Sequence, residues 1–308
     1  MSSTTLYDVP APAKLNLFLH VVGRRADGYH LLQTVFRFID LADTLDFERR
    51  DDGVIERAYE LPGVAPEQDL VVRAARALQR ATGTPYGARI GLAKRIPQGG
   101  GLGGGSSDAA TALIALDCLW NTGLSRRALM ALALPLGADV PVFVFGQSAF
   151  AQGVGEDLAA VDLPDAAYLV AQPAVSVPTP EIFADPKLTR DTKPVKIADF
   201  LAKPSALFGK NDLEPVAIAR YPEIGRCRDW LAAVARVPVR MSGSGACLFA
   251  EFAQMHDALL AGQEIVATMQ AAAVDATAAN ATAAAQAPEF RLVQACAGLA
   301  EHPLRHWI

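Results

Sequence analysis

The chain has 308 residues, of which 51% are hydrophobic and 20% are charged, and its formal net charge is −5. This length and composition favour a soluble globular protein with two domains, and the acidic balance argues against a general nucleic-acid-binding protein. The start of the sequence lacks a charged-then-apolar signal segment, and no apolar run is long enough to span a membrane. We therefore expect a cytoplasmic protein that binds neither nucleic acid nor a membrane.

The first part of the chain alternates between strand and helix patterns. Leu15, Leu17 and Leu19 recur with period two, which is typical of a strand with one buried face. Asp69 is suited to cap a helix that Gly83 stops. In chain order we expect a strand over 14–22, a turn over 24–28, an extended run over 29–47, a helix over 69–82, a strand over 88–93, a glycine-rich loop, a helix over 106–121, a helix from 125 to about 135, and a tight junction over 137–141 that leads into an apolar segment.

A change in composition marks the middle of the chain. Residues 160–167 are rich in Asp, Pro and Ala, and we place a boundary there between a domain over 1–165 and a domain over 166–308. The second domain shows a strand over 168–171, a helix over 223–234, a strand over 237–241, a loop over 242–245, a strand over 246–252, a helix from 255 and a strand over 290–296. This β-α-β-β-α-β order predicts a ferredoxin-like domain within an α+β protein.

One segment departs from these patterns. Residues 271–287 contain eleven alanines, with Thr, Asn, Gln and Asp between them. Alanine favours helix, but the stretch has no large apolar face to bury. We interpret it as a helix extension that frays into a surface loop.

The run from Pro97 to Asp108 carries the strongest functional signal. Six of the seven residues 99–105 are glycine, so successive backbone N–H groups can turn toward one point and bind an anion, most often phosphate. The following helix would present its N-terminal N–H groups and positive dipole end to that phosphate. We predict that this loop binds ATP, and the predicted contact residues are Pro97, Gln98, Gly99, Gly100, Gly101, Leu102, Gly103, Gly104, Gly105, Ser106 and Ser107.

Other glycine-rich motifs fit this run less well. A dinucleotide-binding loop requires an acidic residue at a strand end about 20 residues later, and the nearby candidate Asp117 falls within the predicted helix. A Walker loop ends in Gly-Lys-Ser or Gly-Lys-Thr, and no lysine follows Gly105. The protein-kinase loop requires a downstream V-A-I-K motif, which is absent. A flexible linker is disfavoured because the run joins a strand to a helix.

Three clusters occur in a characteristic order: residues 12–17 (PAKLNL), the glycine-rich loop, and residues 241–246 (MSGSGA). Together they resemble the GHMP kinase superfamily. Four longer segments, over 11–19, 25–30, 137–143 and 178–183, look like the family of 4-diphosphocytidyl-2-C-methyl-D-erythritol kinases within it. The resemblance covers about residues 6–262 and 288–304 and fails only in the alanine-rich segment over 271–287, which looks like an insertion. It implies the two-domain GHMP kinase fold, a mixed α/β N-terminal domain followed by the ferredoxin-like domain, with the active site in the cleft between them.

The resemblance also implies a reaction. ATP would donate its γ-phosphoryl group to the C2 hydroxyl of 4-diphosphocytidyl-2-C-methyl-D-erythritol, in the non-mevalonate route to isoprenoid precursors. Asp139 would accept the hydroxyl proton, and Lys14 would orient Asp139 and stabilise the charge that develops on the attacking oxygen. Without the resemblance, Asp139 would be interpreted as a turn or capping carboxylate and Lys14 as a solvated lysine at the end of a strand.

The same resemblance implies a binding site for the cytidyl group. Tyr29 and Phe183 would stack on the two faces of the cytosine ring, and His30 would form hydrogen bonds with its edge. Asn16 and Thr179 would hold the hydroxyl or the diphosphate of the substrate.

The third cluster and a metal ion complete the expected phosphate site. Gly243, Ser244 and Gly245 would close over the phosphates from the second domain. Mg²⁺ is expected to accompany ATP, with the hydroxyl of Ser106 or Ser107 nearest to it. Asp108 follows these serines and is interpreted as a residue that caps the helix, so the sequence leaves the metal ligands open.

Two alternatives stay open at this stage. The chain could be a GHMP kinase for another small alcohol, such as mevalonate or homoserine, although such substrates need no pair of aromatic residues. It could also be a catalytically inactive member that senses a ligand, since a fold does not prove an activity. The oligomeric state is left as a monomer or a weak homodimer.

Overall fold

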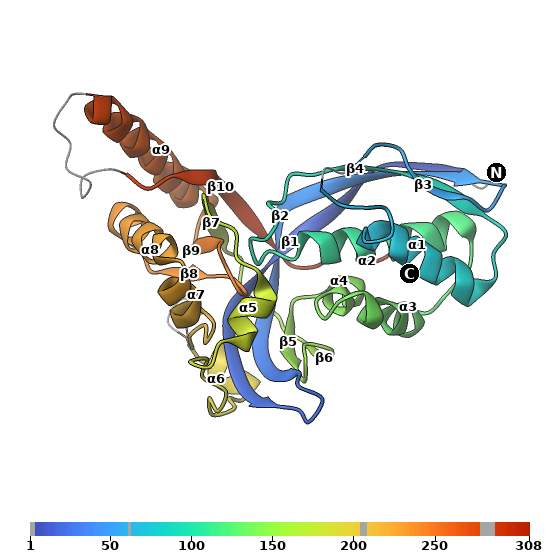
Figure 1. Cartoon of the computed structure of the whole chain (residues 1–308), viewed down its shortest axis with the longest axis horizontal. Helices are drawn as coiled ribbons and strands as arrows, with labels where there is room; N and C mark the ends of the chain where they lie inside the picture. Colours follow the sequence, from blue (N-terminus) through green and yellow to red (C-terminus); the bar gives the residue numbers. More distant parts are fainter. Residues whose placement is uncertain (1–3, 61–62, 204–207, 278–286) are drawn as a thin grey trace.

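The computed structural model describes residues 4–60, 63–203, 208–277 and 287–308, and for residues 273–277 it describes the backbone alone. Two lobes of mixed strands and helices flank a long β-hairpin, as Figure 1 shows. Among the described residues, no helix combines the length and apolar character that crossing a membrane requires.

The hairpin consists of β1 (Thr5–Arg24) and β2 (His30–Arg50), which are paired antiparallel with several register shifts. The turn between them follows the prediction, but both strands are longer than expected. Residues 11–21 of β1 are all buried, so the prediction of a single buried face was wrong. The strand crosses the middle of the molecule, where lobes and loops cover both of its faces (Figure 1), and this burial includes polar residues on the face opposite Leu15 and Leu17.

The N-terminal lobe places helices on one face of a sheet (Figure 1). In the sheet, β2 pairs with β4 (Gly87–Ala93), which pairs with the short β3 (Ile55–Arg57), and β2 also pairs with β5 (Ala149–Gln152), which pairs with β6 (Asp157–Ala160). The helices are α1 (Leu70–Thr82), α2 (Gly104–Trp120), α3 (Arg126–Ala133), the 3₁₀ helix η1 (Leu134–Leu136) and α4 (Val140–Phe145). The helix α2 is buried almost all round, because its alanine-rich surface packs against both the sheet and the neighbouring helices.

The predicted helix boundaries hold where local capping decides them. Asp69 accepts a hydrogen bond from the N–H of Val71, and Gly83 ends α1 in the left-handed conformation. The helix α2 begins two residues earlier than predicted, because left-handed Gly103 already turns the chain into it. No side chain caps α2, so the interpretation of Asp108 as its cap was wrong.

The second lobe has the predicted β-α-β-β-α-β order. Its elements are β7 (Ala167–Pro173), α8 (Pro222–Ala235), β8 (Val239–Met241), β9 (Leu248–Phe252), α9 (Met255–Thr277) and β10 (Phe290–Leu299). The strands lie in the order β10-β7-β9-β8 and all neighbours are antiparallel. In the described part of this lobe, three short helices were not predicted: α5 (Thr179–Ala184), α6 (Ile197–Leu201) and α7 (Glu214–Arg220). Each is too short to show helical periodicity in the sequence.

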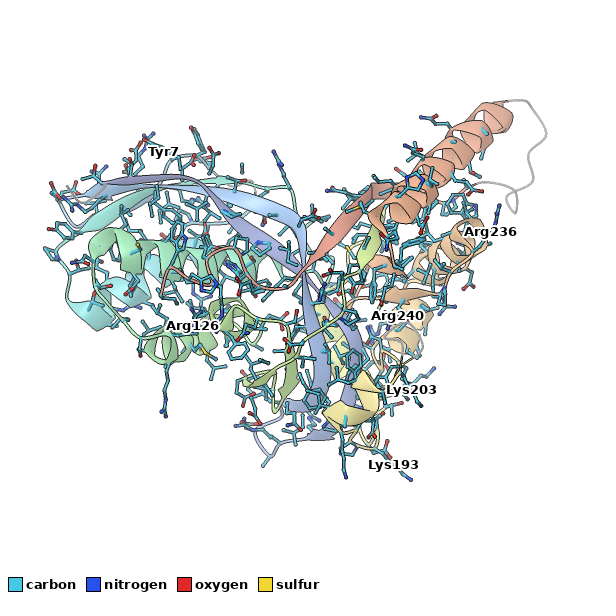
Figure 2. The ribbon with its side chains drawn as sticks, turned by 180° about the vertical axis from the view of Figure 1, so that it is seen from behind. Tyr7, Arg126, Lys193, Lys203, Arg236 and Arg240 are labelled. Atoms are coloured by element: carbon cyan, nitrogen blue, oxygen red, sulfur yellow. The ribbon has the colours of Figure 1, made fainter. Side chains whose placement is uncertain are left out.

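The two lobes share strands and core residues. The end of β10 pairs with β2 at Gly298 and Leu299, which makes the sheet continuous. Arg126 at the start of α3 donates hydrogen bonds to the carbonyl oxygens of Arg305 (2.5 Å) and Ile308 (2.9 Å), and so anchors the C-terminal residues on the N-terminal lobe (Figure 2). The C-terminal end of the chain thus returns to the N-terminal lobe. The division into two domains at residue 165 stays a prediction.

The alanine-rich segment begins as predicted, since α9 continues through its first residues to Thr277. The surface loop that we expected after this helix falls mostly on residues 278–286, which lie outside the described part of the chain.

Candidate active site

A cavity of about 920 Å³ lies between the two lobes, a volume within the usual range for a small-molecule site. Its wall is formed by β1, β2, the glycine-rich loop, the start of α4, α5 and the loop after β8. We call the part formed by the glycine-rich loop, Lys14 and Asp139 the phosphate end, and the part formed by Tyr29, His30 and Phe183 the aromatic end. All of the predicted site residues line this cavity except Ser107 and Gly245.

The structure brings the two predicted glycine clusters together. The backbone N–H of Cys247 donates to the carbonyl oxygen of Gly100 (3.0 Å), and the Ser242 hydroxyl donates to that of Gly101 (3.0 Å). Gly101 has a φ of +74°, and a Cβ atom there would lie 2.2 Å from the carbonyl oxygen of Ser242. Only glycine therefore allows the first loop to approach the second this closely.

The start of α2 faces the phosphate end. Gly103 turns the chain with a φ of +74°, so the first N–H groups of the helix are left without helical acceptors, as in every helix. Ser106 lines the cavity. The hydroxyl of Ser107 is buried and donates to the carbonyl oxygen of Pro12 (2.7 Å). Ser107 therefore joins the helix to β1, whereas Ser106 is free to face a ligand.

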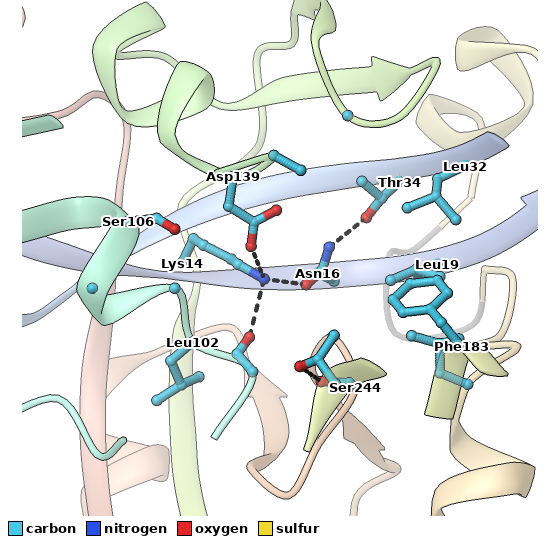
Figure 3. A pocket seen from close by; sticks show the side chains of 18 of the residues that line it. Lys14, Asn16, Leu19, Leu32, Thr34, Leu102, Ser106, Asp139, Phe183 and Ser244 are labelled. Carbon is cyan, nitrogen blue, oxygen red and sulfur yellow. Dashed lines mark hydrogen bonds and ion pairs between the residues drawn. The ribbon is translucent and has the colours of Figure 1, made fainter. Parts of the chain in front are cut away.

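Lys14 is the centre of a buried polar network, which Figure 3 shows. Its side chain is 3% exposed, and its Nζ lies 2.5 Å from Asn16 Oδ1, 3.0 Å from the Gly101 carbonyl oxygen and 3.4 Å from Asp139 Oδ2. These three acceptors match the three protons of an ammonium group. This burial excludes the interpretation of Lys14 as a solvated residue. The positive charge of Lys14 lies beside the Asp139 carboxylate.

Asp139 occupies the position before α4 and is directed into the cavity. Its side chain makes no capping hydrogen bond to that helix, and it is 37% exposed. The Asp139 carboxylate is therefore oriented by its ion pair with Lys14 and not by a capping hydrogen bond to α4. One charged partner and partial access to the cavity are what a proton acceptor for a bound hydroxyl requires.

The orientation of Asn16 follows from its neighbours. The Thr34 hydroxyl donates its single proton to the Phe18 carbonyl oxygen (2.5 Å), so it can only accept from Asn16 Nδ2 at 3.0 Å. This places the amide oxygen of Asn16 toward Lys14 (Figure 3). The network thus joins β2 to the lysine through defined donors and acceptors.

At the aromatic end, the rings of His30 and Phe183 lie side by side, with centroids 5.1 Å apart and an interplanar angle of 35°. Tyr29 lines the same region and is 64% exposed. Thr179 connects this end to the phosphate end, because its hydroxyl lies 2.7 Å from that of Ser244 (Figure 3).

Comparison with known proteins agrees with this geometry. Models of the GHMP kinase family match the chain over residues 69–147 (GHMP kinases N terminal domain) and 197–271 (GHMP kinases C terminal). A protein of Bordetella bronchiseptica named 4-diphosphocytidyl-2-C-methyl-D-erythritol kinase is 71% identical over 304 residues, which is 99% of each chain. The chain belongs to this kinase family.

Further matches include a second homologue and two solved structures. The homologue from Aromatoleum aromaticum, which carries the same name, is 62% identical over 83% of this chain and 88% of its own. A crystal structure of 4-(cytidine 5′-diphospho)-2C-methyl-D-erythritol kinase superposes with a TM-score of 0.70 at 36% identity, covering 94% of this chain and 97% of that one. A homoserine kinase from Cytophaga hutchinsonii, at 15% identity and a TM-score of 0.65, supports the fold alone. The predicted family, GHMP kinase fold and ATP-dependent kinase class are confirmed.

Sequence reasoning missed Lys94 in this kinase. Its Nζ forms ion pairs with Asp43 and, at 2.7 Å, with Asp108 on α2, and the residue lines the cavity beside the glycine-rich loop. Burial opposes the lysine charge, but the two carboxylates outweigh it and raise the pKa of Lys94. Burial also raises the pKa of Asp108. Since Asp43 lies more than fifty positions from its partners, no local pattern could have revealed the cluster.

Arg190 was also missed. Its Nε donates to His30 Nε2 at 3.0 Å, and its other nitrogens donate to the carbonyl oxygens of Leu188, Phe183 and Asp185 at 2.8–3.1 Å. Burial, followed by the charges of Arg190 and Arg24, lowers the pKa of His30. The imidazole is therefore neutral near pH 7, with one donor and one acceptor nitrogen.

Proposed function

We propose that this kinase transfers the γ-phosphoryl group of ATP to the C2 hydroxyl of 4-diphosphocytidyl-2-C-methyl-D-erythritol and so forms the 2-phosphate used in the non-mevalonate isoprenoid route. The observation that carries the proposal is one continuous cavity with a glycine-rich loop and a Lys14–Asp139 pair at one end and aromatic residues at the other. The names of the homologues support the choice of substrate.

In the proposed reaction, Asp139 accepts the proton of the C2 hydroxyl as the oxygen attacks the γ-phosphorus. The new bond joins that oxygen to phosphorus, the bond from phosphorus to the bridging β–γ oxygen breaks, and ADP leaves with the electron pair. Lys14 keeps Asp139 in place and stabilises negative charge on the attacking oxygen. Phosphoryl transfer depends mainly on positioning and charge neutralisation, which this buried network provides.

ATP is assigned to the phosphate end. The glycine-rich loop and the first N–H groups of α2 would bind its phosphates, and Gly243 and Ser244, which line the cavity next to this loop, would close over them. Gly245 and Ser107 support the cavity wall without lining it: the N–H of Gly245 donates to the Ser242 carbonyl oxygen (3.0 Å), and Ser107 is anchored on Pro12.

Mg²⁺ is proposed to bind together with the nucleotide. Within the described part of the chain, no three His, Cys, Asp or Glu side chains form a cluster that could hold a metal, so the residues present fit an ion carried mainly by phosphate oxygens and water. The Ser106 hydroxyl lines the cavity and would be available to the ion, whereas the Ser107 hydroxyl is bonded to Pro12. When bound, the ion would neutralise charge on the transferred phosphate.

The aromatic end is assigned to the cytidyl group. Tyr29 and Phe183 would stack on cytosine, and His30 would bind its edge. Asn16, which bonds Lys14, and Thr179, which bonds Ser244, line the cavity and would hold the polyol hydroxyls or the diphosphate. A GHMP kinase for a smaller alcohol would leave this end of the cavity empty, and an inactive sensor would have no need of an oriented Lys14–Asp139 pair, so both alternatives are disfavoured.

The deciding experiment measures ADP release with Mg-ATP and four acceptors: the cytidyl compound, the same polyol without its cytidyl group, mevalonate and homoserine. Turnover with the cytidyl compound alone is expected. Turnover with another acceptor would refute the proposed substrate, and ATP binding without any turnover would favour the sensor. Cytoplasmic location and a monomeric or weakly dimeric state remain proposals, to be checked by fractionation and by light scattering.

A further inference from the structure

Arg190 connects two segments at the aromatic end that are far apart in the sequence. It lies in the segment after α5, and the guanidinium donates to His30 at the start of β2, 160 residues away. The same group donates to the carbonyl oxygens of Phe183 and Asp185 before the turn that follows α5, and to that of Leu188 after it. Arg190 therefore joins the imidazole of His30 to the backbone at Phe183, whose ring packs against that imidazole.

The contact with Arg190 also determines which nitrogen of His30 carries a proton. A guanidinium group has only donors and stays protonated in proteins. Because Arg190 Nε donates to His30 Nε2, Nε2 must offer its lone pair, and the single proton of the neutral ring must be on Nδ1. A doubly protonated ring is disfavoured as well, since it would direct an N–H toward the guanidinium.

The Nδ1–H group is left for a ligand. Among the described residues, none forms a hydrogen bond with His30 Nδ1, and His30 lines the cavity. The ring is packed against Phe183, and turning it over would exchange Nε2 for a carbon atom and break the bond from Arg190. The aromatic end thus presents a fixed donor to the edge of any ring bound beside it.

We infer that Arg190 is a positioning residue that makes His30 select cytosine over uracil, by holding its Nδ1–H toward the ring nitrogen N3. This inference rests on the proposed function, because it assumes a pyrimidine at the aromatic end. In cytosine, N3 is an acceptor and pairs with Nδ1–H. In uracil, N3 carries a hydrogen, so two donors would face each other and both would lose their partners.

The first test needs no variant and no substrate. Long-range ¹H–¹⁵N correlation spectra of the free wild-type protein report the tautomer of each histidine, and the spectrum of His30→Gln identifies the signals of His30. The Nδ1–H tautomer is expected near neutral pH. An Nε2–H or doubly protonated His30 would overturn the inference at once.

The second test compares Arg190→Met with Arg24→Met. Arg24 contributes positive charge near His30 but donates to the Gly28 carbonyl oxygen instead of the imidazole. Only Arg190→Met is expected to release the ring into a mixture of tautomers, whereas Arg24→Met should keep Nδ1–H. A mixture in both variants would show that charge alone, and not the hydrogen bond, selects the tautomer, which would overturn the inference.

The third test measures kcat/KM for the cytidyl substrate and for its analogue with uracil. The wild type should prefer cytosine by about 10²–10⁴-fold, as expected where a donor meets a donor. Arg190→Met should reduce this preference to about 10-fold or less, mainly through KM, since Arg190 contacts no group of the Lys14–Asp139 network. An unchanged preference in a variant whose tautomer has changed would refute the specificity role. If the wild type does not use the cytidyl compound, the proposed function fails, while the spectra still decide what Arg190 does to His30.

Discussion

At the phosphate end of the cavity, Lys14 and its partners Asn16 and Thr34 lie on paired strands and are almost completely buried. At the aromatic end, Tyr29 is 64% exposed and lies beside the turn between those strands, and His30 depends on a single arginine for its orientation. The first region is determined by many connected hydrogen bonds and the second by a few side chains. We therefore expect substitutions at the phosphate end to reduce the rate of transfer and those at the aromatic end to weaken substrate binding.

The largest expected effect is that of Asp139→Asn. The amide keeps the size of the side chain but cannot accept the hydroxyl proton, so kcat should fall about 10²–10⁴-fold while the Kd for ATP changes little. Steady-state kinetics and calorimetric titration with ATP measure the two quantities. Asp51→Asn is a suitable control, because Asp51 is an exposed carboxylate paired with Arg49. An undiminished kcat would remove Asp139 from the mechanism.

The next largest effect should come from Gly101→Ala at the contact between the two glycine clusters. A Cβ atom 2.2 Å from the Ser242 carbonyl oxygen would force the loops apart and misplace the phosphates, with a loss of about 10–100-fold in kcat/KM for ATP. Gly123→Ala is the matched control: Gly123 also has a positive φ (+67°), but its Cβ would meet nothing within 4 Å.

The control should lose only stability, about 1–2 kcal/mol from the left-handed conformation, with unchanged kinetics. Thermal unfolding separates this contribution from the loss of activity. Equal kinetic losses in both variants would show that the close approach of the loops is not important for ATP binding.

A smaller effect is expected from Tyr29→Ala, and it should appear in a different parameter. Loss of a stacking partner should raise KM for the cytidyl substrate about 10-fold, while KM for ATP stays constant. Tyr59→Ala is the control, since Tyr59 is 73% exposed and does not line the cavity. If Tyr29→Ala raised both KM values equally, Tyr29 would be structural and the contrast between the two ends would fail.

The smallest effect should follow Thr34→Val, which tests how the network at the phosphate end is oriented. The Asn16 amide would lose the acceptor for its Nδ2, so its oxygen would no longer be held toward Lys14, and kcat should fall about 3–10-fold. Thr82→Val removes a hydroxyl that donates to the Leu78 carbonyl oxygen and accepts from the N–H of Thr84; because Thr82 does not line the cavity, kcat should stay unchanged. A rise in KM for the cytidyl substrate without a change in kcat would contradict the division between the two ends.

Local features of the fold could be predicted because neighbouring residues decide them. The ends of α1 follow from the capping side chain of Asp69 and the left-handed conformation of Gly83. The β-α-β-β-α-β order of the second lobe follows from periodicity and from turn residues between its elements. In contrast, α4 has only six residues and was expected merely as an apolar segment after a tight junction, since so short a run has no visible period.

The site was predictable to the extent that its residues lie within motifs. The glycine-rich loop signals phosphate binding through backbone freedom alone, and Lys14, Asp139 and the aromatic residues were assigned through resemblance to the kinase family. Ser106 and Ser107 illustrate the limit of this reasoning. They are neighbours with identical side chains, but consecutive positions on a helix point in different directions, and only one of them lines the cavity.

The sequence by itself determined the family, the phosphate-binding loop and the order of the elements, because these depend on short-range patterns. Only the tertiary structure decided that both faces of β1 are buried, that Lys94 joins two carboxylates, and that Arg190 reaches His30. Each of these facts depends on groups brought together from distant parts of the chain. Burial then strengthens their interactions and makes an unpaired charge or donor costly, and no local pattern in the sequence records such pairings.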